Sequence, residues 1–90
     1  MTAITVDTAL EITFEVAQTP QTFAHVRSLS GILGRAAEVR ARIPVGTWIT
    51  VPEDLQPTVT TYLCDRCGFR YMGCLVKGVE LEDVLVKESM

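Results

Sequence analysis

The sequence predicts a single α+β domain. We expect an antiparallel β-sheet of about five to six strands with one kinked helix packed on one face. Two patterns carry this prediction: a period-two alternation of apolar residues near the N-terminus, and an apolar repeat at three- and four-residue spacing further along. The chain has 90 residues, which leaves room for one domain spanning residues 1–90. Its apolar content of 48% and charged content of 21% are typical of a folded chain.

The alternation runs over residues 3–17 and predicts two half-buried strands. Polar side chains such as Thr13 and Glu15 take odd positions, whereas the apolar side chains take even positions: Ile4, Val6, Leu10, Ile12, Phe14 and Val16. Asp7-Thr8-Ala9 interrupts the alternation with residue types that favour a tight turn. We therefore expect a short β-hairpin here.

The helical repeat predicts a helix that begins at Thr19-Pro20 and ends near Ala41, before Pro44. Gly31 and Gly34 lie inside this segment, where each glycine costs up to about 1 kcal/mol relative to alanine. We favour a kink at these glycines. The alternatives are a break between two shorter helices, and a close approach of another backbone at the two glycines.

The remaining sequence predicts four more strands. Residues Val45–Val51, Thr58–Leu63, Phe69–Lys77 and Val84–Val86 are rich in β-branched and aromatic side chains, and a proline-containing loop spans 52–57. The expected element order is therefore β-β-α-β-β-β-β, with the helix covering one face of the sheet.

A cysteine motif is the strongest chemical signal in the chain. Cys64 and Cys67 are spaced Cys-x-x-Cys with Gly68 directly after, and Cys74 follows. Over about ten residues, this segment resembles the first metal knuckle of rubredoxins and zinc ribbons. The resemblance implies that Cys64 and Cys67 bind zinc or iron. The second Cys-x-x-Cys-Gly motif of those families is absent here.

A tetrahedral zinc site needs two more ligands than this motif supplies. Cys74 and His25 could complete a Cys₃His site within one chain, or two chains could each contribute Cys64 and Cys67 on a two-fold axis. The third alternative is that the thiols bind no metal. A thiol–disulfide enzyme is disfavoured because the motif does not open a helix within a βαβ unit.

The sequence carries no catalytic constellation, and we expect a protein that is not an enzyme. His25 is the single histidine, and its spacing from the cysteines does not suggest a nucleophile and base pair. A net charge of −3 argues against free duplex nucleic acid as a ligand. The N-terminus lacks a signal-peptide pattern, and the apolar stretches are too short to span a membrane, so we expect a cytoplasmic protein.

These observations favour a small non-enzymatic protein-binding module that engages another protein or a nucleoprotein complex. The candidate contacts are charged side chains: Glu11, Glu15, Arg27, Arg35, Glu80, Glu82 and Asp83. In size and acidic character the chain resembles small phage inhibitors, including anti-CRISPR proteins, and the resemblance implies that its carboxylates occupy a basic nucleic-acid channel. A rubredoxin-like or zinc-ribbon-like metal or redox carrier is the alternative. Exposed edge strands also predict a homodimer.

Overall fold

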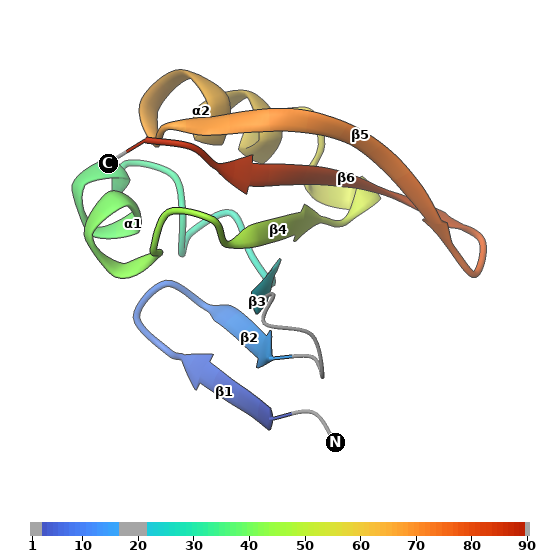
Figure 1. Cartoon of the computed structure of the whole chain (residues 1–90). Helices are drawn as coiled ribbons and strands as arrows, with labels where there is room; N and C mark the ends of the chain where they lie inside the picture. Colours follow the sequence, from blue (N-terminus) through green and yellow to red (C-terminus); the bar gives the residue numbers. More distant parts are fainter. Residues whose placement is uncertain (1–2, 17–21, 90) are drawn as a thin grey trace.

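The computed structural model describes residues 3–16 and 22–89 and confirms the α+β fold. The helices and strands, in chain order, are β1 (Ala3–Asp7), β2 (Ile12–Val16), β3 (Thr22–Val26), α1 (Ala36–Arg42), β4 (Trp48–Val51), the short 3-10 helix η1 (Glu53–Leu55), α2 (Thr58–Arg66), β5 (Phe69–Lys77) and β6 (Glu80–Lys87). The strands form one six-stranded sheet in the order β1-β2-β3-β4-β6-β5 (Figure 1). All neighbouring strands are antiparallel except β3 and β4, which are parallel.

The predicted N-terminal hairpin is confirmed. Residues of β1 pair with residues of β2 from Ala3 opposite Val16 to Asp7 opposite Ile12. The carboxylate of Asp7 closes the turn, because its Oδ1 accepts hydrogen bonds from the backbone N–H groups of Ala9 at 3.0 Å and Leu10 at 3.1 Å. The turn therefore forms where the sequence places it.

Both helices lie over the same face of the sheet. Asp83, Leu85 and Lys87 alternate along β6 and so point to one side. Asp83 accepts a hydrogen bond from Thr60 of α2, and Lys87 donates to the backbone of α1. Between the helices and this face lies a core that includes Val39 of α1, Val59 and Leu63 of α2, and Ile49 and Leu85 of the sheet.

The predicted single helix over residues 19–41 is wrong. Its expected start at Thr19-Pro20 lies outside the described residues, but Thr22–Val26 is strand β3 and only Ala36–Arg42 is helical. The segment Thr22–Val26 contains β-branched and aromatic residues whose alternate members, Ala24 and Val26, are buried. The short alternation of β3 overlaps an apolar repeat of helical spacing, so the sequence pattern favoured a helix over these five residues.

Gly31 allows a close backbone approach, and the preferred interpretation of a helix kink is wrong. A Cβ at this position would lie 2.0 Å from the carbonyl oxygen of Leu10. Only glycine therefore lets the loop before α1 pack against the turn between β1 and β2. Gly34 adopts a φ of 77°, which suits glycine in the loop that leads into α1.

The predicted strand over Thr58–Leu63 is also wrong, because these residues belong to α2. The helix buries Val59 and Leu63, which are spaced by four residues and lie on one helical face. Strand propensity is a weak preference that burial of an apolar face readily outweighs. The other three predicted strands are confirmed as β4, β5 and β6, with bounds of Trp48–Val51, Phe69–Lys77 and Glu80–Lys87.

Candidate functional site

The three cysteines lie at different places around the C-terminal end of α2. Cys64 is half-buried within the helix, Cys67 is the buried residue that follows its last turn, and Cys74 is exposed on β5. The predicted strand on the N-terminal side of the Cys-x-x-Cys motif is therefore replaced by a helix. Gly68 does reverse the chain with a φ of 78°, as the motif predicts, and leads directly into β5.

The environment of the thiols favours their protonated form. Burial raises the pKa of Cys67 to about 11, against the weaker opposing effects of Arg40 and Lys87. Desolvation, together with the negative charge of Asp65, raises the pKa of Cys64. A thiolate is the form that binds zinc or attacks an electrophile, so neither thiol is activated by its surroundings.

The predicted metal ligands do not converge in the part of the chain that the structure describes. Within residues 3–16 and 22–89, no three histidine, cysteine, aspartate or glutamate side chains are grouped closely enough to hold a metal ion. Cys67 is 0% exposed within the core, whereas His25 lies on β3, on the sheet face away from the helices. A Cys₃His site within one chain does not fit this arrangement, and zinc binding between two chains stays a prediction.

His25 lies on a strand rather than on the expected helix, and it bridges neighbouring strands. Its Nδ1 forms a 2.7 Å hydrogen bond with Oγ1 of Thr50 on β4, and its Nε2 lies 3.9 Å from Oε2 of Glu15 on β2. Partial burial lowers the pKa of His25, and the nearby charge of Glu15 opposes this shift. Thr50 is only 4% exposed, so its hydroxyl is shielded from an external substrate. These contacts of His25 therefore link β3 to its neighbours β2 and β4.

Several charged side chains that were predicted to bind a partner have intramolecular roles. Glu11 accepts hydrogen bonds from the hydroxyls of Ser28 and Ser30. Arg35 donates to the carbonyl oxygen of Ala9 at 2.5 Å and to Glu38 at 2.6 Å. The contacts of Glu11 with the two serines and of Arg35 with Ala9 fasten the loop before α1 to the N-terminal hairpin.

The acidic residues of β6 differ sharply in accessibility. Asp83 accepts a 2.7 Å hydrogen bond from Thr60, and Glu82 is 9% exposed, whereas Glu80 is exposed at the start of the strand. Arg27 is also exposed, with a 3.5 Å contact to the hydroxyl of Thr13. Among the residues of the predicted contact set on β6, Glu80 is thus the most available to a partner.

An exposed apolar surface on the β5–β6 hairpin was not predicted from the sequence. This hairpin extends away from the rest of the fold, and we call it the β5–β6 arm (Figure 1). Val79 at its tip is 100% exposed and Val76 is 70% exposed. The other large apolar side chains exposed on the arm are Tyr71, Met72, Leu75 and Leu81. The sequence does contain a signal for this surface. Apolar residues occur on both sides of Gly78, and they are more numerous than the small core of this chain can bury.

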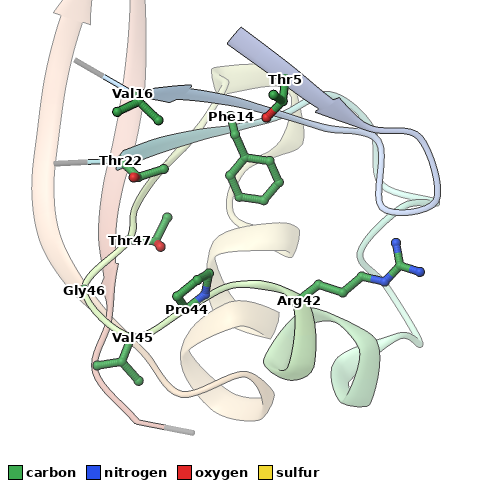
Figure 2. Close-up of a pocket in the computed structure, with 9 residues that line it drawn as sticks. All are labelled: Thr5, Phe14, Val16, Thr22, Arg42, Pro44, Val45, Gly46 and Thr47. Atoms are coloured by element: carbon green, nitrogen blue, oxygen red, sulfur yellow. The ribbon is translucent and has the colours of Figure 1, made fainter. Parts of the chain in front are cut away.

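A hollow of about 500 Å³ lies between the N-terminal strands and the loop that follows α1. Figure 2 shows the ring of Phe14 pointing toward Pro44, with the hydroxyls of Thr5, Thr22 and Thr47 around the same space. Nη1 of Arg42 lies 2.9 Å from both carboxylate oxygens of Asp7, which neutralises that positive charge. The hollow therefore has a largely neutral lining without a paired acid and base.

Comparison with known proteins adds no assignment: no protein-family model, curated protein or solved structure matches this sequence. No helix among the described residues is long and apolar enough to cross a lipid bilayer.

Proposed function

We propose that this chain is a small non-enzymatic protein-binding module. Within that class, we propose a phage-type inhibitor, similar in character to anti-CRISPR proteins, that binds a host protein or nucleoprotein complex. The observation that supports this proposal is the cluster of exposed apolar side chains on the β5–β6 arm, with Val79 fully exposed at the tip.

The arm exposes apolar surface at an energetic cost that binding would recover. Each Å² of apolar surface removed from water contributes about 25 cal/mol. Contiguous exposed apolar patches on small proteins commonly mark interaction sites. Val76, Val79 and Leu81 lie on both sides of the Gly78 turn and present such a surface.

Hydrogen bonds at Leu81 hold the β6 side of the arm in place next to the tip, so the arm can present Val79 without a large ordering cost. The backbone N–H of Leu81 donates to Oε1 of Glu53 at 3.0 Å, and the carbonyl of Leu81 accepts from Nε2 of Gln56 at 3.0 Å. Gln56 also donates to the carbonyl of Val51 at 2.8 Å, which links this contact to β4. Preorganisation of this kind favours binding because less conformational entropy is lost.

Glu80 adds a negative charge beside the apolar tip. A basic rim on the partner would complement this carboxylate, which would raise the association rate more than the affinity. The contribution first expected from Glu11, Glu82 and Asp83 is reduced, because these side chains are hydrogen-bonded within the fold or buried.

The proposal is tested by affinity capture from host lysate, with wild-type protein compared with a Val79→Lys/Leu81→Lys variant. We expect a stoichiometric partner that the variant binds at least about tenfold more weakly, since loss of a hot-spot contact costs about 2 kcal/mol or more. Asp65→Lys, an exposed change of the same charge on α2, near the end of β5 that lies opposite the tip, serves as the matched control.

Equal capture by the wild-type protein and the arm variant would contradict the arm as the binding surface. Catalytic turnover of a small compound that is lost on Cys64→Ala would contradict the non-enzymatic role. Circular dichroism of each variant establishes that the fold is retained.

A further inference from the structure

The outer edge of β5 is unpaired within the described sheet. In the strand order, β5 is an end strand with β6 as its neighbour. An edge strand presents backbone N–H and C=O groups that can accept another strand. In addition, β5 spans nine residues and includes exposed Leu75 and Val76, so this edge is both long and apolar.

A β-bulge limits which part of the edge can pair regularly. Opposite β6, Tyr71 pairs with Leu85 and Gly73 pairs with Val84, which leaves Met72 as the extra residue. A bulge disrupts the ladder locally and bends its strand. From Gly73 to Lys77 the register is uninterrupted. An added strand therefore finds a regular template over these five residues.

We propose that β5 pairs with the β5 strand of a second copy of this chain, antiparallel about a two-fold axis at Leu75. An antiparallel pairing of a five-residue segment with itself places the axis at its middle residue. Leu75 then lies opposite Leu75 of the second copy. Gly73 lies opposite Lys77, and Cys74 lies opposite Val76.

This register matches side chains by both charge and polarity. Lys77 carries the one charge of the segment Gly73–Lys77, and it faces a glycine, so no like charges lie directly opposite each other. Leu75, which is 40% exposed, packs against its own copy on one face of the extended sheet. On the other face, exposed Cys74 and Val76 cover each other.

The second sheet edge, β1, is a weaker candidate. Its exposed apolar side chains, Ile4 and Val6, point to one face only, so a paired copy would cover apolar groups on one side of the sheet. Pairing of β1 with β5 would be a head-to-tail contact, which gives rings or open filaments rather than a closed dimer. The symmetric β5 contact closes after two copies.

The dimer is expected to be weak, because a five-residue strand contact falls below the roughly 1,200 Å² of a standard stable interface. It goes beyond the partner-binding proposal, because it concerns the outer edge of β5 between Gly73 and Lys77. A monomeric result would overturn the dimer without affecting the affinity-capture test of a foreign partner.

The test is analytical ultracentrifugation over a protein concentration series that extends into the millimolar range. We expect the wild-type protein to shift from monomer to dimer, and both Leu75→Lys and Leu75→Glu to remain monomeric, since each places like charges at the axis. An equimolar mixture of the two variants should restore a dimer, because opposite charges then meet across the axis.

The matched control is Val6→Lys, which changes an exposed valine on the opposite sheet edge. This variant should dimerise like the wild-type protein. The proposal is overturned by a wild-type monomer at every concentration, by a dimer that survives Leu75→Lys, by failure of the mixture to associate, or by loss of the dimer in Val6→Lys.

Discussion

The Nζ of Lys87 donates a 2.7 Å hydrogen bond to the carbonyl oxygen of Ile43, the C-cap residue that follows α1. It also donates to the carbonyl of Arg40 at 2.9 Å and lies 5.8 Å from the centroid of the Phe69 ring. A buried ammonium group thus satisfies backbone acceptors at the negative end of a helix. This contact joins the last strand of the sheet to α1.

Replacement of Lys87 by methionine should destabilise the fold. Methionine retains the length and apolar stem of the side chain but leaves the carbonyls of Arg40 and Ile43 without this donor. A buried acceptor that loses its partner costs about 1–3 kcal/mol. Urea denaturation should therefore show a lower free energy of unfolding. Lys77→Met, at an exposed lysine, should change it by less than about 0.5 kcal/mol.

A Lys87→Met variant that is as stable as the wild-type protein would contradict a net stabilising role for this contact. That result would mean that relief from burying the charge offsets the lost hydrogen bonds.

The buried thiol of Cys67 should make stability fall at alkaline pH. Its pKa is raised to about 11 in the folded protein, whereas the unfolded thiol ionises near pH 9. Between these values the folded state binds more protons than the unfolded state, so the free energy of unfolding decreases as pH rises. The contribution of Cys67 is fully present below pH 9, and about 2 kcal/mol should be lost by pH 11.

The measurement is the free energy of unfolding from pH 8 to 11 for the wild-type protein and for Cys67→Ala. Burial lowers the pKa of Lys87, which contributes a slope of the opposite sign in both proteins. The difference between the two curves therefore reports the ionisation of Cys67 together with its electrostatic coupling to Lys87. Parallel curves would show that the thiol ionises equally readily in the folded and unfolded states.

Gly31→Ala should be strongly destabilising, because the new Cβ would lie 2.0 Å from the carbonyl oxygen of Leu10. Relief requires a shift of backbone in the hairpin turn, and we expect a loss of more than about 2 kcal/mol. The measurement is thermal unfolding followed by circular dichroism. Gly34→Asn is the control, because open space surrounds that position and asparagine tolerates its positive φ. A mild effect at Gly31 that equals the effect at Gly34 would argue against the close packing of these loops.

Zinc content provides a direct test of the metal-carrier alternative. The protonated state of Cys67 and the separation of its predicted partners lead us to expect far less than one zinc ion per chain. Elemental analysis of protein expressed in zinc-supplemented medium checks this, together with the melting temperature before and after addition of a chelator. Stoichiometric zinc that is lost on Cys64→Ser would favour the carrier role.

Local patterns in the sequence were sufficient for the elements stabilised by local interactions. The hairpin of β1 and β2 follows from strict alternation and from Asp7, whose carboxylate bonds to the next residues of its own turn. The β5 strand and the reversal at Gly68 follow in the same way from composition and from a glycine with positive φ. Together, these local patterns of strand and turn residues were sufficient to predict the α+β class.

The segments that were predicted incorrectly depend on distant partners. Thr58–Leu63 has the composition of a strand, yet burial of Val59 and Leu63 in the core stabilises a helix. Gly31 could be interpreted as a kink until the carbonyl of Leu10 was placed against it. Because propensities differ by only tenths of a kcal/mol per residue, packing decides between the alternatives.

The sequence by itself determined the fold class, the hairpin turn and the unusual Cys-x-x-Cys-Gly segment. Only the tertiary structure decided that Cys67 is buried, that Lys87 caps a helix 44 residues away in sequence, and that Val79 is left fully exposed on an arm. The physical reason is that solvent exposure and partner choice depend on which surfaces meet in three dimensions. The type of a residue and its immediate neighbours in sequence determine neither its solvent exposure nor its contact partners.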